Sequence, residues 1–108
     1  MEYWEEAVGL VQQAAVRDPD EPEYRRWHAS GLAQLAQAQA AAGDPATALA
    51  RLDTSIGILR ALYEALSTAG RRQDLQKGIE SAVKVSEGWQ GAPATCRQQW
   101  SALLHALA

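Results

Sequence analysis

The chain has 108 residues and carries ten Lys and Arg against thirteen Asp and Glu, which gives a formal net charge of −3. This length suits one domain with a modest core, and the acidic balance argues against bulk binding of nucleic acid. With one cysteine, no signal peptide and no apolar run near the roughly 20 residues that cross a bilayer, we expect a cytoplasmic protein that binds no membrane.

The beginning of the chain predicts two helices separated by a proline-rich break. The first is predicted over residues 2–17, where apolar residues recur at helical spacing behind an acidic first turn. The second starts after the break, where Asp20 followed by Glu23 resembles a capping box with Asp in place of Ser or Thr. We expect this helix to run to about Ala42.

The turn Gly43-Asp44-Pro45 predicts that the second helix folds back on a third. Gly43 can take the left-handed conformation that ends a helix, Asp44 can cap the next one, and Pro45 suits its first position. We expect the third helix to pass Leu66 and to stop at Gly70. Its apolar stripe contains Ala48, Leu49, Leu52, Ser55, Ile56 and Leu59.

The second half predicts two more helices, over about 72–87 and from Pro93 to nearly the end of the chain. Trp100 falls on the apolar side of the last helix, where we expect it to be part of the core. No segment alternates with the period of a strand, so the predicted fold class is all-α, with about five helices joined by short connections. We expect a single domain over residues 1–108, made of a helix and two antiparallel hairpins (2–17, 21–70 and 72–107).

Two parts of the chain are alike and resemble a known repeat family. The pattern Ala7-x3-Val11-x2-Ala14-x4-Pro19 resembles the second helix of a tetratricopeptide repeat, and a similar pattern begins at Ala48, an offset of 41 residues. Val11 departs from that family, which usually has an aromatic residue there, and the offset exceeds the family's usual period of about 34. The chain is therefore similar to the long-helix repeats of kinesin light chains and of large bacterial signalling proteins.

The resemblance implies that the antiparallel hairpins stack as a short solenoid. It also implies a protein–protein interaction module or scaffold, part of a larger array or assembly, whose partner is a protein or peptide. In that family, ligands bind the concave face formed by the first helix of each hairpin. When this face is mapped onto the present chain, it is shallow. The second hairpin, 72–107, contributes a small basic region at one end of it. The partner-binding residues that the resemblance implies are Ser30, Ala33, Gln34, Gln37, Lys77, Glu80 and Lys84.

Two further residues are candidates for partner contacts. Trp89 lies in the turn before the last helix, where it is either exposed to a partner or a lid on that turn. Leu10 lies on the side of the first helix that has no neighbour in the predicted order, and an exposed apolar residue of that kind often marks a contact surface. A second copy of the chain, forming a homo-oligomer, is one candidate for that contact.

The sequence contains no pattern typical of catalysis or cofactor binding. His28 and His105 each lack a Cys, His or Asp at metal-ligand spacing, and no nucleotide-binding or nucleophile motif is present. Cys96 is expected to pack as a small buried hydrophobe rather than to act as a nucleophile. We therefore expect neither an enzyme nor a metal or cofactor. The alternatives left open are a structural helical homo-oligomerisation domain and a small ligand-binding or enzymatic helical bundle.

Overall fold

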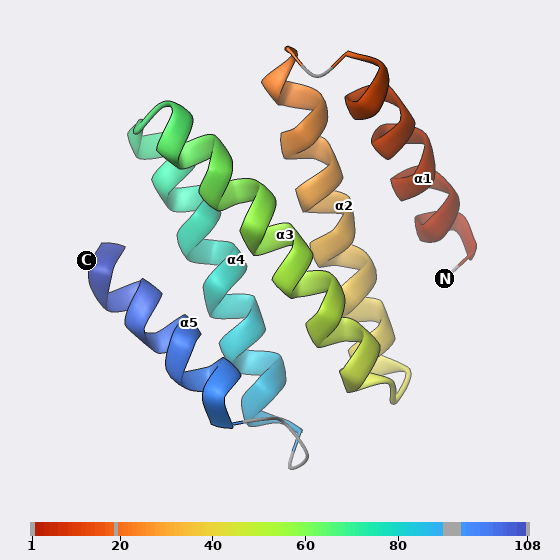
Figure 1. Cartoon of the computed structure of the whole chain (residues 1–108). Coiled ribbons are helices and arrows are strands. Elements are labelled where there is room, and N and C mark those ends of the chain that lie inside the picture. The colour runs from red at the N-terminus through yellow and green to blue at the C-terminus, as the bar shows by residue number, and fades with distance from the viewer. Residues whose placement is uncertain (1, 19, 90–93, 108) are drawn as a thin grey trace.

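The structure, a computed structural model, describes residues 2–18, 20–89 and 94–107, with side chains from Glu5 onward in the first helix and from Arg97 onward in the last. Within these ranges it contains five helices and no strand, so the predicted all-α class is confirmed. The helices are α1 (Glu2–Arg17), α2 (Pro22–Ala41), α3 (Pro45–Ala65), α4 (Ala69–Glu87) and α5 (Ala94–Leu107) (Figure 1).

The helices pack in the order in which they follow along the chain. Each helix contacts the next one, and α2 also contacts α4. Figure 1 shows α1 at one edge, α5 at the other, and α3 in front of α2 and α4. The Cα atoms span 39 × 35 × 17 Å, and the shortest extent holds no more than two helices at an interaxial distance of about 8–10 Å. α3 therefore covers one side of the α2–α4 pair and leaves the opposite side open.

The turn between α2 and α3 has the chemistry predicted for it. Gly43 adopts a φ of +91°, a left-handed conformation that residues with a Cβ rarely take. The Asp44 carboxylate accepts a 3.3 Å hydrogen bond from the backbone N–H of Thr47, and Pro45 is the first residue of α3. This local chemistry ends one helix and starts the next within three residues, so α2 and α3 run antiparallel.

The start of α2 differs from the prediction by one residue. Glu21, rather than Asp20, caps the helix: its carboxylate accepts a 3.2 Å hydrogen bond from the backbone N–H of Glu23. Pro22 explains the shift, because its fixed φ suits the first helical position and the capping residue directly precedes that position.

The predicted continuation of the third helix to Gly70 was wrong. α3 ends at Ala65, and Thr68 caps the next helix by accepting a 3.2 Å hydrogen bond from the backbone N–H of Arg71. The Arg71 guanidinium donates a 2.8 Å hydrogen bond to the carbonyl of Leu62, in the last turn of α3. Because these side chains satisfy backbone groups at both helix ends, the chain reverses earlier, and Gly70 lies in the first turn of α4.

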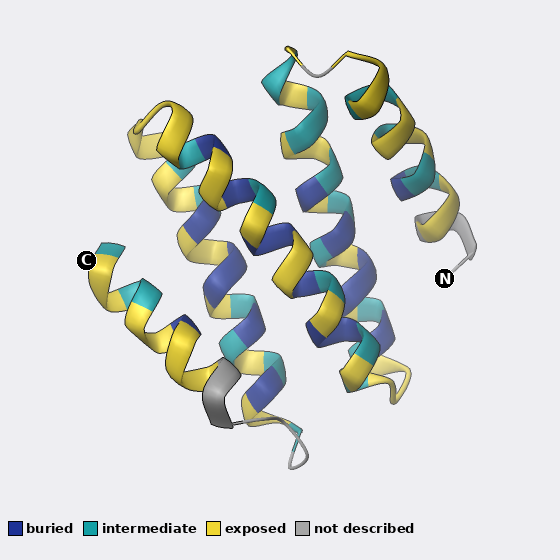
Figure 2. Cartoon of the chain, in the orientation of Figure 1, coloured by how far each residue is buried: buried dark blue, intermediate teal, exposed yellow. Residues whose placement is uncertain are grey.

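The main core lies along the facing sides of α2, α3 and α4 (Figure 2). Trp100 of α5 is 3% exposed and belongs to it, as predicted. The hydroxyl of Ser55, a buried residue of α3, donates a 2.8 Å hydrogen bond to the carbonyl of Ala29 and so ties α3 to α2. The Arg72 guanidinium donates to the carbonyl of Leu107, which joins the start of α4 to the end of α5.

α1 attaches to α2 through a separate small cluster. Val8 is buried there with Leu32 and Leu35. Gly31 allows the two helices to approach closely, since a Cβ at that position would lie only 3.0 Å from Cγ2 of Val8. The position of α1 therefore depends on the absence of a side chain at Gly31.

A candidate binding groove between α2 and α4

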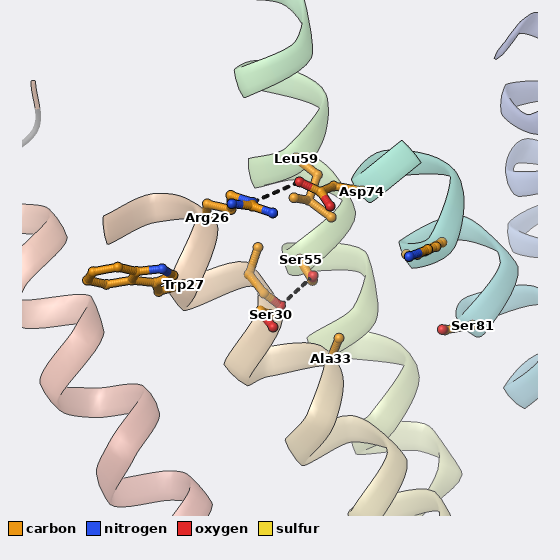
Figure 3. A pocket seen from close by; sticks show the side chains of 11 residues that line it. Arg26, Trp27, Ser30, Ala33, Ser55, Leu59, Asp74 and Ser81 are labelled. Carbon is orange, nitrogen blue, oxygen red and sulfur yellow. Dashed lines mark hydrogen bonds and ion pairs between the residues drawn. The ribbon is translucent and has the colours of Figure 1, made fainter. Parts of the chain in front are cut away.

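Two hollows on the open side of the α2–α4 pair join into one groove. The first has a volume of about 330 Å³, with α2 and α4 as its walls and α3 as its floor. Figure 3 shows this hollow from close by. Its lining includes Arg26, Trp27, Ser30 and Ala33 from α2, Ser55 and Leu59 from α3, and Asp74, Lys77 and Ser81 from α4.

The second hollow continues the groove toward the C-terminal ends of α2 and α4. Its volume is about 650 Å³, and it shares Lys77 and Ser81 with the first hollow. Both helices run antiparallel to α3 and so parallel to each other, which lets one groove follow them for most of their length. The second lining also includes Gln37 and Ala40 from α2 and Glu80, Lys84 and Val85 from α4.

Helical spacing places these side chains on one face of each helix. The lining residues recur every three or four positions, from Arg26 to Gln37 on α2 and from Asp74 to Lys84 on α4. Gly78 lets α4 approach the floor, because a Cβ there would lie 3.1 Å from Cδ1 of Leu59. A larger residue at that position would push α4 away from α3 and alter the groove.

An ion pair spans the first hollow near the N-terminal ends of α2 and α4. Nε of Arg26 donates a 2.9 Å hydrogen bond to Oδ2 of Asp74 (Figure 3). This hydrogen bond raises the pKa of Arg26 above its ordinary value, so the guanidinium stays charged. Because the Arg26 side chain is 51% exposed, the pair contributes only about 0–1 kcal/mol to stability. Its main effect is to neutralise the charge at this end of the groove.

The rest of the groove carries a small excess of positive charge. Lys77 and Lys84 form no ion pair with any residue that the structure describes. Glu80 lies between them on α4, and its carboxylate accepts a 3.4 Å hydrogen bond from the Gln76 amide. Beyond the Arg26–Asp74 pair, the groove thus presents two ammonium groups and one carboxylate.

The structure brings most of the predicted partner-binding residues together in this groove. Six of the seven that the resemblance implied line it: Ser30, Ala33, Gln37, Lys77, Glu80 and Lys84. The seventh, Gln34, borders a different hollow, between α1 and α2. That these residues bind a partner stays a prediction.

Sequence reasoning missed several residues that line the groove, among them Arg26, Trp27 and Asp74. All three had a signal in the sequence, because each shares a helical face with a predicted residue. Arg26 and Trp27 precede Ser30 by four and three positions, and Asp74 precedes Lys77 by three.

A third hollow, of about 240 Å³, lies between α1 and α2. Its lining consists of Ala7, Val8 and Val11 from α1 and Trp27, Ser30, Gly31 and Gln34 from α2. Figure 3 shows the Trp27 ring on the α1 side of α2. The residue is 52% exposed, and its ring meets that of Tyr24 edge-on, with centroids 5.7 Å apart. Trp27 and Ser30 border both this hollow and the groove.

The two remaining candidates lie apart from the groove. Trp89 is half-buried and packs against the core, as a lid on the turn would, and it is less exposed than Trp27. Leu10 is 62% exposed, and Val16, also on α1, is 75% exposed. Among the described helices α1 contacts α2 alone, so the faces of α1 turned away from α2 have no neighbour within the described part of the chain.

The histidines and the cysteine were the other residues considered for chemistry. His28 is half-buried, and this burial lowers its pKa, while His105 is exposed. The described residues include no group of three His, Cys, Asp or Glu side chains placed to hold a metal ion. The side chain of Cys96, predicted to be buried, lies outside the described residues.

Comparison with known proteins does not assign the chain to a family. No family model, no curated protein and no solved structure matches the chain. The similarity to tetratricopeptide repeats therefore rests on the residues named above. Over the residues that the structure describes, none of the helices combines the length and apolar character needed to cross a membrane.

Proposed function

We propose that this chain is a protein–protein interaction module of tetratricopeptide-like hairpins that binds an extended, acidic segment of a partner protein in the α2–α4 groove. The observation that carries the proposal is the groove itself, which follows two parallel helices and is bordered by Lys77 and Lys84. The contact between α2 and α4 supports the interpretation as stacked hairpins, because the first helices of successive hairpins then lie side by side.

The shape and lining of the groove suit a polypeptide better than a compact small molecule. The two hollows adjoin along the helices and open to solvent, whereas sites for small ligands usually enclose most of the ligand surface. Ser30, Gln37 and Ser81 supply hydroxyl and amide groups that can hydrogen-bond to an extended backbone. The two lysines can pair with carboxylates, which selects the charge of the partner more than it adds affinity.

The groove has the composition of a binding surface rather than of a catalytic site. Its described lining contains serines but neither His nor Cys, so no imidazole base lies beside a hydroxyl nucleophile there. The Asp74 carboxylate is held by Arg26. The proposal accordingly assigns the groove no reaction, cofactor or metal.

A random dodecapeptide library displayed on phage tests the proposal, with the immobilised full chain as the target. We expect the enriched peptides to be rich in Asp and Glu. The double variant Lys77→Glu/Lys84→Glu should bind them at least about tenfold more weakly, because two attractive contacts become repulsive. Arg97→Glu is the matched control, since Arg97 is exposed on α5 and does not line the groove, and it should leave binding unchanged.

The variant Asp74→Asn tests the opposite effect, an increase in the affinity for the acidic peptide. Removal of the Asp74 carboxylate leaves Arg26 paired only with Glu23, at 3.6 Å, so more of its positive charge is available to the groove. An acidic peptide should therefore bind about two- to tenfold more tightly at low salt. Enrichment of peptides without acidic residues, or equal binding by the Lys77→Glu/Lys84→Glu variant, would exclude the groove as the site.

The exposed apolar side chains of α1 favour a second candidate function, a helical homo-oligomerisation domain. Leu10 and Val16 lie on a helix at the edge of the structure, where a second copy of the chain could cover them. In this alternative the contact surface is the outer side of α1, and the groove plays no part.

A further inference from the structure

We infer that the hollow between α1 and α2 receives one large apolar side chain of the partner segment, next to Trp27. The inference rests on the proposed function, because the segment that lies in the groove is the one that supplies this side chain. It adds a site of specificity that the charge of the groove does not provide.

The lining of the hollow suits an apolar group. Val8 and Val11 form much of the α1 wall, and Gly31 on α2 contributes no side chain. Its described lining residues carry no formal charge, and their polar groups are the Ser30 hydroxyl, the Gln34 amide and the indole N–H of Trp27. The volume of about 240 Å³ exceeds the roughly 150 Å³ that is enough to hold benzene in an engineered apolar cavity. An aromatic ring or a branched aliphatic chain therefore fits.

Trp27 is the side chain whose exposed apolar surface such an occupant would cover. It is 52% exposed although its ring is largely apolar and pairs with the Tyr24 ring in a T-shaped contact. Tryptophans dominate binding at many interfaces, because the ring buries a large area at a small cost in conformational entropy. An apolar side chain seated in the hollow would cover part of the exposed indole.

The hollow and the groove are neighbours, because Trp27 and Ser30 of α2 border both. A segment that lies in the groove and crosses α2 at Ser30 would reach the hollow. Lys77 and Lys84 lie on the opposite wall of the groove, on α4. The partner segment therefore has acidic residues beside α4 and a large apolar residue beside α1.

The peptides enriched by the phage selection test this inference. We expect strong binders to contain one Leu, Met, Phe or Trp at a constant distance from their acidic residues. In a synthetic consensus peptide, replacement of that residue by Ala should weaken binding about 30-fold by isothermal titration, the effect of losing one interface anchor. Trp27→Ala in the protein should weaken the same peptide by a similar factor.

Two protein variants, one that fills the hollow and one that does not, form a matched pair. Ala7→Leu extends a side chain into the hollow and should weaken the consensus peptide about tenfold by excluding its anchor. Gln13→Leu adds the same side chain at an exposed position of α1 outside the hollow, so it should leave the affinity unchanged. Thermal melts followed by circular dichroism establish that both variants are folded.

The outcomes separate this inference from the proposed function. Acidic peptides that depend on Lys77 but contain no recurrent apolar residue, and that bind Ala7→Leu and Trp27→Ala normally, would overturn the inference and leave the proposed function standing. A selection that enriches no acidic peptide would overturn both.

Discussion

Trp100 is a large aromatic side chain of the core, and its burial anchors the last helix. The residue is 3% exposed, and α5 contacts α4 alone among the described helices. Trp100→Ala should therefore lower the free energy of unfolding by about 3–5 kcal/mol, the usual cost of removing a large buried ring. Urea denaturation followed by circular dichroism measures this change. Trp27→Ala is the control, since that residue is half exposed and its loss should cost no more than about 1 kcal/mol.

His28 makes the stability of the chain depend on pH. Burial lowers the pKa of His28 below its usual value of 6.5, because a charged imidazole is poorly solvated within the structure. The unfolded chain thus binds the proton more tightly than the folded chain does. Stability is therefore lost as the pH falls from about 6.5 through the lower pKa of the folded state.

His28→Gln should remove this part of the pH dependence. Denaturant midpoints at about pH 7 and pH 5 provide the measurement, with the exposed His105→Gln as the control. The unsubstituted chain and His105→Gln should lose more stability on acidification than His28→Gln does. Equal losses in all three proteins would contradict the assignment to His28.

At the scale of a helix, substitution of two glycines by Ala separates the effect of intrinsic helix propensity from the effect of packing. A Cβ at Gly57, an exposed position of α3, would meet no atom within 4 Å, whereas one at Gly31 of α2 would lie 3.0 Å from Val8. Because Ala is favoured over Gly inside a helix, Gly57→Ala should stabilise the chain by about 0.5–1 kcal/mol. Gly31→Ala should bring no such gain, because Val8 is buried and its β-branched side chain has one preferred rotamer.

Thermal or urea unfolding of these two variants measures the contact between α1 and α2. The difference between them is the cost of displacing Val8, since the intrinsic gain is the same at both positions. If Gly31→Ala stabilised the chain as much as Gly57→Ala, α1 would not be held at Gly31, and the hollow beside Trp27 would not have the shape described above.

For the whole molecule, the question is whether the chain self-associates through the outer side of α1 or stays a monomer. Leu10 is 62% exposed, so Leu10→Glu should leave the helix content and the unfolding free energy of the monomer within about 0.5 kcal/mol. The same substitution should abolish any self-association seen by size-exclusion chromatography with light scattering, because it places a charge in the contact surface. Ala102→Glu, at an exposed position of α5, is the control.

Either of two results would reject this role for Leu10. Unfolding of the monomer by Leu10→Glu would show that the residue belongs to a packed core. A mass that rises with concentration equally in the variant and in the unsubstituted chain would place the association surface elsewhere, and the homo-oligomer alternative through α1 would be wrong.

The order and approximate extent of the helices could be predicted from the sequence, because apolar periodicity and turn chemistry are local properties. The range predicted for α1 matches the structure, and Gly43 and Asp44 act as predicted. The resemblance to a repeat family indicated which residues of α2 and α4 share a binding face. The errors at Glu21 and Thr68 are also local, since several neighbouring side chains could cap each helix and the sequence pattern does not rank them.

Only the tertiary structure decided which faces meet. It placed α4 beside α2 above α3, so that Arg26 reaches Asp74 at 2.9 Å, and it left Trp27 exposed beside a hollow while Trp89 packs against the core. Periodicity specifies the apolar face of a helix but not the partner of that face, because the burial of apolar surface is non-directional. The exposure of Trp27 depends on how α1 lies against α2, and that approach is set by Gly31 against Val8.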